Sequence, residues 1–285
     1  MNRKSIAALS ALSLLMVLLV AGPAGATPKG SMLAYNTALA QKACRAKKGK
    51  AKKVCLRRGK ARGLARTRKM MSTERGLYGY GIPAAAIPAR NGTLVWNKKL
   101  KTTPGASRTD FVLYSSRSVP GNRKIVVSGT VSVPKGKAPA GGWPVISWAH
   151  GTVGLADKCA PSKGGDQGSY GGAEPLVQGW LEDGYAVVAT DYEGLGTPGI
   201  HPYLQGDSEA HGVLDIVRAS RALAPSLSKR VVIAGHSQGG HAALFAAENA
   251  PGWSRDVNHL GTGAYAPPAD LQLLGALIGL MPNDA

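Results

Sequence analysis

Short apolar runs alternate with amphipathic or alanine-rich stretches from about residue 72 onward. The apolar runs predict β-strands at residues 111–116, 124–134, 143–149, 185–190, 230–234 and 260–266, with a turn at 120–122. The stretches between them predict helices at 173–183, 207–224 and 238–249. This alternation predicts the α/β fold class, with a mostly parallel sheet flanked by helices. In such a sheet, functional residues gather at the carboxyl ends of the strands.

The N-terminus has the pattern of a targeting segment. Arg3 and Lys4 precede an uncharged apolar stretch at residues 6–20, and small residues follow at 24–26. This order predicts a signal peptide over residues 1–26, cleaved after Ala26, and a secreted protein. The alternative is an uncleaved membrane anchor, for which the apolar stretch is short.

The charge of the chain is concentrated in an arm that follows this segment. The net charge is +19, yet residues 1–73 hold 17 of the 35 Lys and Arg and no Asp or Glu. The remaining residues carry 18 basic and 16 acidic groups, so the domain predicted over 74–285 is nearly neutral. We therefore separate a basic N-terminal arm, residues 27–73, from the α/β domain.

The densest part of the arm is residues 42–69, where 14 of 28 residues are basic. Such a block repels itself, so we expect an extended or only partly helical segment. It could adhere to anionic envelope polymers, lipid head groups or DNA, or serve only as a solubilising spacer. The block has no aromatic residue for base stacking, so we expect no specific nucleic acid partner.

Three cysteines make an odd set. Cys44 and Cys55 bracket ten residues, and an exported protein could join them in a local disulfide. Cys159 is then left without a partner, which would lie elsewhere or be missing.

The strongest chemical motif is Gly235-His-Ser-Gln-Gly239, which fits the G-x-S-x-G nucleophile elbow. In a glycine-rich chain the pattern alone is weak, and it could be a turn without chemistry. Its context is specific, because Ser237 follows a short apolar strand and opens an alanine-rich helix. Glycines two residues before and after the serine relieve the crowding of a sharp turn. We therefore predict Ser237 as a catalytic nucleophile.

A second turn, Trp148-Ala-His-Gly-Thr152, ends the strand at 143–149. In hydrolases with this elbow, such a turn presents a backbone N–H to the substrate oxygen. Thr152 and Gln238 are the predicted oxyanion donors. His150 and His236 are predicted to be structural.

Several motifs in order resemble the secretory lipase family of α/β-hydrolases. They are Trp148-Ala-His-Gly-Thr-Val-Gly, Cys159-Ala-Pro-Ser, Asp191-Tyr-Glu-Gly-Leu-Gly-Thr-Pro-Gly, His201-Pro-Tyr-Leu, Gly235-His-Ser-Gln-Gly-Gly-His-Ala-Ala-Leu-Phe-Ala and Ala266-Pro-Pro-Ala-Asp. The resemblance spans about residues 109–275 and excludes the basic arm. It implies hydrolysis of acyl or lipid-like esters through a Ser237 acyl-enzyme, without a cofactor or metal.

The chain departs from the family after the elbow. The fold places an acid and then a histidine after the serine, but only 48 residues follow Ser237. His241 lies one helical turn further, and His259 and Asp256 precede the next strand, at the wrong end of the sheet. Asp270 follows that strand, but no histidine comes after it. We expect a truncated or partial sequence that lacks the last strands, the triad acid and the histidine, and ends near the start of a lid helix at 274–281.

Two further hypotheses stay open. Asp191 and Glu193 suggest paired carboxylates, but a loop that hydrogen-bonds its own backbone is the simpler interpretation. Functionally, we expect a secreted lipase or esterase, inactive or slow if its base is missing. The alternatives are an acyltransferase or peptidase on the same elbow, or a non-catalytic exported protein that binds anionic surfaces through residues 42–69.

Overall fold

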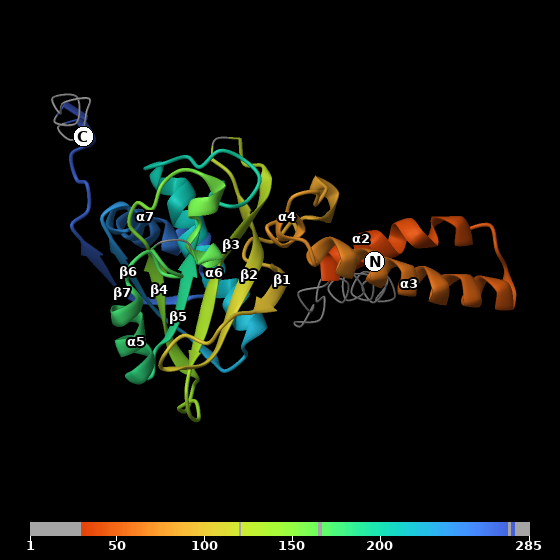
Figure 1. The fold of residues 1–285 in the computed structure, drawn as a ribbon, viewed down its shortest axis with the longest axis horizontal. Coiled ribbons are helices and arrows are strands. Elements are labelled where there is room, and N and C mark those ends of the chain that lie inside the picture. The colour runs from red at the N-terminus through yellow and green to blue at the C-terminus, as the bar shows by residue number, and fades with distance from the viewer. Residues whose placement is uncertain (1–29, 120, 165–166, 273–274, 277–285) are drawn as a thin grey trace, which may run out of the picture.

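A seven-stranded sheet organises the chain (Figure 1), and its order is β1-β2-β3-β5-β4-β6-β7. The computed structural model describes residues 30–119, 121–164, 167–272 and 275–276. The strands are β1 (Leu94–Lys99), β2 (Ala106–Arg117), β3 (Lys124–Pro134), β4 (Trp143–Ala149), β5 (Ala186–Thr190), β6 (Leu227–His236) and β7 (Asn258–Tyr265). Strands β1, β2, β3 and β5 pair antiparallel, whereas β5, β4, β6 and β7 pair parallel.

The α/β prediction is confirmed, and each predicted strand and helix is present within a few residues. The α-helices are α2 (Gly30–Gln41), α3 (Gly49–Met71), α4 (Glu74–Leu77), α5 (Glu174–Glu182), α6 (Gly206–Leu223) and α7 (Gln238–Trp253). Short 3₁₀ turns lie at Lys42–Cys44, Ala84–Ala86, Asp157–Cys159 and Pro161–Lys163. Strand β1 was not predicted. The signal peptide predicted at 1–26 and most of the helix predicted at 274–281 lie outside the described residues.

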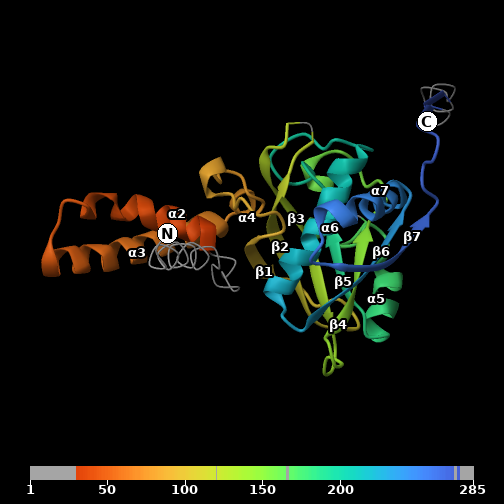
Figure 2. The same ribbon diagram turned by 180° about the vertical axis from the view of Figure 1, so that it is seen from behind.

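Helices cover both faces of the sheet. This explains why the sequences of its central strands are continuous apolar runs. Helices α6 and α7 pack on one face, against alternate residues such as Val188 of β5. Helix α5 packs on the other face, against neighbours such as Val187. A cluster around Phe111 and Leu113 extends that second face toward β1. Figure 2 shows the same layers from behind.

The basic arm forms a helical hairpin, so the expectation of an extended or partly helical segment was wrong. Helices α2 and α3 lie side by side (Figure 1), joined by a disulfide between Cys44 and Cys55. Glycines permit their close approach: a Cβ atom at Gly63 would lie 2.6 Å from the Cα atom of Thr37. The self-repulsion of the block is therefore opposed by a covalent link and by tight backbone packing.

Polar contacts also hold the hairpin together. The amide of Asn36 donates a buried 2.9 Å hydrogen bond to the Thr67 hydroxyl, and the Gln41 amide donates to the carbonyl of Leu56. At its base the hairpin packs on the β1 edge through an apolar cluster of Tyr35, Met70, Met71, Ile82, Ala86 and Trp96. Its far end projects away from the sheet (Figures 1 and 2). Within the described residues, no helix combines the length and apolarity needed to cross a membrane.

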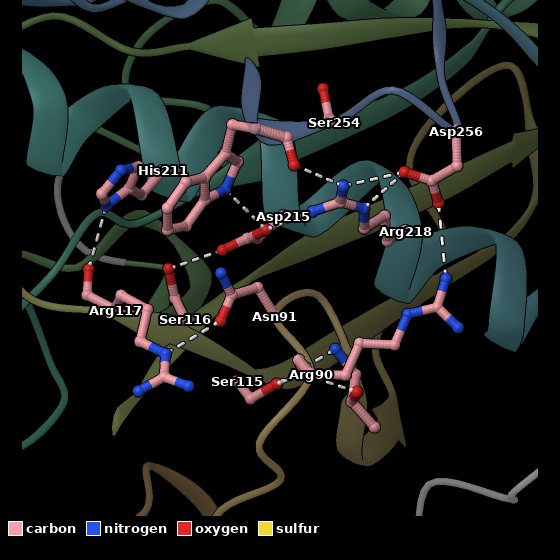
Figure 3. A network of polar contacts seen from close by, with 12 residues as sticks. Arg90, Asn91, Ser115, Ser116, Arg117, His211, Asp215, Arg218, Ser254 and Asp256 are labelled. Atoms are coloured by element: carbon pink, nitrogen blue, oxygen red, sulfur yellow. Dashed lines mark hydrogen bonds and ion pairs between the residues drawn. The ribbon is translucent and has the colours of Figure 1, made fainter. Parts of the chain in front are cut away.

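A buried ionic network ties the helical face to β2 (Figure 3). Asp215 of α6 accepts hydrogen bonds from the hydroxyl of Ser116, the indole of Trp253 and the guanidinium of Arg218. Arg218 also forms an ion pair with Asp256 at 2.8 Å, so the carboxylate of Asp256 has a structural partner far from the elbow. Burial raises the pKa of Asp215 to about 7, although its three donors act to lower it.

Removing the disulfide should loosen the hairpin selectively. Closing a loop of this size (sequence separation 11) is worth about 2.5–3 kcal/mol in the chain-entropy model. In the double variant Cys44→Ser/Cys55→Ser, we expect amide hydrogen exchange in α2 and α3 to be roughly 100-fold faster. Exchange in β4, β5 and β6 should not change. Cys159→Ser is the matched control, because Cys159 is a free thiol, and equal exchange rates in the two proteins would contradict the prediction.

The Asp215 network should make stability depend on pH. A carboxyl whose pKa is raised on folding stabilises the folded state below its unfolded value, and this contribution is lost as pH rises toward the folded value. The window for Asp215 therefore runs from about pH 4 to about pH 7. As pH rises through this window, the wild type should lose unfolding free energy relative to Asp215→Asn, by up to about 1.4 kcal/mol per pH unit. Urea titrations at several pH values measure this, and a constant difference would contradict it.

Candidate active site

Ser237 occupies a strained turn between β6 and α7. Its backbone has φ 56° and ψ −120°, a left-handed conformation that non-glycine residues rarely adopt. The turn is held by two backbone hydrogen bonds: the N–H of Ser237 donates to Tyr265, and the N–H of His241 donates to the carbonyl of Ser237. Strain of this kind persists only where surrounding structure imposes it, and it is concentrated at functional sites.

The glycines around Ser237 are sterically required, as the motif predicts. A Cβ atom at Gly235 would lie 2.0 Å from the carbonyl oxygen of Gly239. One at Gly239 would lie 1.9 Å from the carbonyl oxygen of Ala149, the last residue of β4. Contacts below 3.0 Å force the backbone to move, so only glycine lets α7 start this close to β4.

The turn after β4 lies beside the nucleophile. A Cβ atom at Gly151 would lie 3.6 Å from the Cβ atom of Ser237. The next residue, Thr152, is exposed, and its hydroxyl lies 2.8 Å from that of Tyr203. Gln238 is the first residue of α7, so its N–H is one of the unpaired donors at the positive end of the helix. The structure thus brings Ser237, the Thr152 turn and Gln238 to one edge of the sheet, and their catalytic roles remain predictions.

A buried polar layer that was not predicted lies behind Gln238. The side-chain amide of Gln238 donates to Glu209 at 2.8 Å and to Nε2 of His201 at 3.0 Å. His241 Nδ1 lies 2.9 Å from the second oxygen of Glu209, which is fully buried. One feature of the sequence could have predicted this layer: Glu209 lies four residues before Val213, on the apolar face of α6. A carboxylate there needs buried partners.

Burial lowers the pKa of two histidines near the elbow, His150 and His201. His150 is buried, with its ring 4.5 Å from that of Tyr192, and burial lowers its pKa to about 4. Tyr192, at φ 70°, donates its hydroxyl hydrogen bond to the carbonyl of His150. Burial also lowers the pKa of His201, whose Nδ1 lies 2.9 Å from the carbonyl oxygen of Glu193. His201 Nδ1–H therefore donates to that carbonyl, which leaves Nε2 to accept from Gln238.

The suggested carboxylates accept hydrogen bonds from distant serines, not from the backbone of their own loop as the simpler interpretation expected. Asp191 accepts from the hydroxyl of Ser128 and from both the hydroxyl and the N–H of Ser162. Glu193 accepts from the hydroxyl of Ser208. Across the described ranges, no group of three or more His, Cys, Asp or Glu side chains is placed to hold a metal ion.

No base contacts the nucleophile in the described part of the chain. There, no histidine forms a hydrogen bond with the Ser237 hydroxyl. His241 faces Glu209 of α6, and His259 near the start of β7 contacts Thr262. These placements agree with the expectation that neither histidine serves as the triad base.

An apolar groove of about 550 Å³ runs beside the elbow. It is lined by Trp148, Gly151, Gly171, Gly172, Ala173, Pro175, Leu176, His236 and Tyr265. Gly151 lies next to Ser237, and His236 directly precedes it, so the groove lies beside the nucleophile. Its walls offer mostly aliphatic and aromatic surface, which suits a hydrocarbon chain.

The elbow packing can be tested by adding one methyl group. Gly239→Ala would push a Cβ atom into the Ala149 carbonyl and should destabilise the fold by about 3 kcal/mol or more. Gly179→Ala in α5 is the matched control, since a Cβ there meets no atom within 4 Å. It should stabilise by about 0.5–1 kcal/mol through helix propensity. Thermal unfolding of both variants measures this, and similar midpoints would refute the steric argument.

Comparisons with known proteins agree with this geometry. Residues 172–284 match a family model described as secretory lipase. The chain is 28% identical to a probable inactive lipase of Mycobacterium tuberculosis, covering 73% of this chain and 44% of that protein. It is also 28% identical to Lipase A of Moesziomyces aphidis, covering 66% of this chain and 42% of that protein. The chain thus spans less than half the length of these two relatives.

A solved structure shares the fold. The rice cell wall degrading esterase LipA of Xanthomonas oryzae superimposes with a TM-score of 0.54 at 28% identity, covering 64% of this chain and 51% of that one. The family match includes the elbow, the groove-lining helix α5 and the strands that carry Ser237 and Tyr265. With the fold and the strained serine, these matches show that the chain is similar to the secretory lipase family of α/β-hydrolases.

Proposed function

We propose that this protein hydrolyses carboxylic esters through an acyl-enzyme formed on Ser237. One observation carries the proposal: Ser237 is held in a left-handed turn at the start of α7, directly beside Gly151 and the apolar groove. The turn raises its hydroxyl above the carboxyl edge of the sheet, where a substrate carbonyl can approach.

The chemistry follows from that placement. The Ser237 oxygen attacks the ester carbonyl, its proton passes through water to the departing alkoxide, and the alcohol leaves. No histidine in the described part of the chain contacts Ser237 to carry that proton. The N–H of Gln238 and an N–H of the Thr152 turn stabilise the oxyanion, each worth about 3–4 kcal/mol in related hydrolases. Water then attacks the acyl-enzyme and releases the acid. Glu209 and His201 position Gln238, because they anchor its side chain from behind.

The groove indicates the substrate class. Trp148, Leu176 and Tyr265 present apolar surface within reach of the elbow. A hydrocarbon acyl chain lying there would be removed from water, which gains about 0.8 kcal/mol per buried methylene. We therefore propose acyl or lipid-like esters as substrates. Export, as the predicted signal peptide and the family both suggest, would place the enzyme where such esters are found.

The alternatives differ in what Ser237 does. An acyltransferase or peptidase would use the same elbow with another acceptor or another acyl group. A non-catalytic protein would bind anionic material through residues 42–69 and make no use of Ser237. One of the two curated relatives is named a lipase and the other a probable inactive lipase, so turnover by this chain is the decisive measurement.

Hydrolysis of p-nitrophenyl acetate and p-nitrophenyl octanoate by the full chain tests the proposal. We expect ester turnover with a higher kcat/KM for the octanoate, because the groove holds its acyl chain. Ser237→Ala should remove this turnover, because no acyl-enzyme can then form. Ser226→Ala is the control, since Ser226 is exposed and lies in the loop before β6; it should leave kcat unchanged.

Two results would contradict the proposal. Equal turnover by the wild type and Ser237→Ala would show that another group performs the reaction. A folded wild type without turnover on either ester would favour the non-catalytic alternative. Addition of an alcohol or amine acceptor distinguishes transfer from hydrolysis, because a transferase would form the new ester or amide in preference to the acid.

A further inference from the structure

All the basic side chains of residues 42–69 are exposed to solvent. They are Lys42, Arg45, Lys47, Lys48, Lys50, Lys52, Lys53, Arg57, Arg58, Lys60, Arg62, Arg66, Arg68 and Lys69. The first 73 residues contain no Asp or Glu. Within the described residues, none of these 14 cations forms an ion pair with a carboxylate. The positive charge of the hairpin is therefore uncompensated and available to a partner.

The hairpin holds these charges on a fixed frame. The Cys44–Cys55 disulfide closes its tip, and Gly59 and Gly63 bring the two helix backbones together. A disordered tail must lose conformational entropy when it binds, but a frame that is already ordered does not. The disulfide and the glycine contacts thus keep like charges close together despite their repulsion. Binding of an anion would reduce that repulsion.

The cations surround α3 and do not form one stripe. The side of α3 that faces α2 is marked by Gly59, Gly63, Thr67 and Met71, which recur every four residues and are buried. Basic residues occupy the remaining directions around the helix axis. A flat bilayer could reach only one side of such a helix. A flexible chain could wrap around it and contact most of the charges.

Other features of the block argue against a membrane and against base recognition. A helix that lies in a bilayer surface needs a continuous apolar face with Trp, Phe or Leu, but Val54 is an isolated exposed apolar residue of α3. Residues 42–69 contain no aromatic side chain on which a base could stack. Recognition here must rest on charge, with Arg forks suited to phosphate oxygens.

We propose that the basic block of the hairpin, residues 42–69, binds a linear phosphate-bearing polyanion. The polyanion wraps around α3, and its charge density is what the hairpin recognises. The site is separate from the elbow. The hairpin packs at β1, whereas Ser237 follows β6, five strands away in the sheet order. At about 4.8 Å per strand, β1 and β6 lie roughly 24 Å apart across the sheet, so a polymer bound to the hairpin should not block the nucleophile. The hairpin would tether the α/β domain to a polyanionic matrix.

Binding of the full disulfide-bonded chain to immobilised long-chain inorganic polyphosphate tests this, measured across a range of NaCl concentrations. We expect log K to fall linearly with log salt concentration, because binding releases counterions. The variant Lys52→Glu/Lys53→Glu/Arg57→Glu/Arg58→Glu should lose at least about 100-fold in affinity at 100 mM NaCl. Its salt slope should be shallower by about three, as four contacts at about 0.7 each predict.

The control variant is Lys135→Glu/Lys137→Glu/Lys158→Glu/Lys229→Glu, which changes the net charge equally at exposed positions outside the hairpin. It should retain affinity within about threefold. Equal losses in both variants would overturn the proposal, because net charge and not the hairpin would then govern binding. Absence of wild-type binding would also overturn it. Circular dichroism checks that both variants keep their helices.

A second experiment distinguishes binding to a polymer from binding to a membrane. Vesicles of phosphatidylglycerol, supplied at equal total phosphate, should bind the wild type more weakly than polyphosphate does. Tighter binding to the vesicles would overturn the wrapped-polymer proposal in favour of a lipid surface. Neither binding experiment depends on ester turnover, so Ser237→Ala should bind polyphosphate as the wild type does.

Discussion

The contact between Gly239 and the carbonyl of Ala149 is the constraint on which the site depends. It lets α7 begin where β4 ends, with no room for even a methyl group between them. Because of it, Ser237 is forced into a left-handed turn and Gly151 is brought beside the nucleophile. The strain at Ser237 is balanced by the parallel pairing of β4, β6 and β7, which fixes both sides of the turn.

A second layer of interactions makes this edge rigid. Glu209 is buried on α6, yet its two oxygens bind Gln238 and His241, both on α7. The carboxylate thus links the two helices that cover one face of the sheet. A buried charge with good partners is costly to disturb, because removing one partner leaves the other unsatisfied. This layer holds the first turn of α7, which carries the predicted oxyanion donor, the N–H of Gln238.

Periodicity alone predicted most of the α/β domain, because central strands such as β3 and β5 are buried on both faces and the helices that cover them are amphipathic or alanine-rich. Strand β1 was missed because its sequence, Leu94-Val-Trp-Asn-Lys-Lys99, ends in exposed polar residues typical of an edge. The helical hairpin was missed because charge repulsion was weighed against helix propensity without the disulfide and the glycine contacts. Ser237 was predictable from a local motif. The partners of Gln238 were not, since Glu209 and His201 reach it from distant parts of the chain.

The distribution of charge and of buried surface points to two parts with different tasks. The α/β domain is nearly neutral, and its buried carboxylates are ion-paired, as Asp215 is with Arg218, or hydrogen-bonded, as Asp191 is to Ser128. A neutral surface does not repel an uncharged ester. The hairpin carries 14 basic residues and no acid, and it depends on a disulfide and glycine packing for its order. Charge of one sign at that density costs stability, so the structure maintains it only by covalent and steric means. Confining that charge to the β1 edge keeps it away from the groove, where a strong positive field would favour anionic products over neutral substrates.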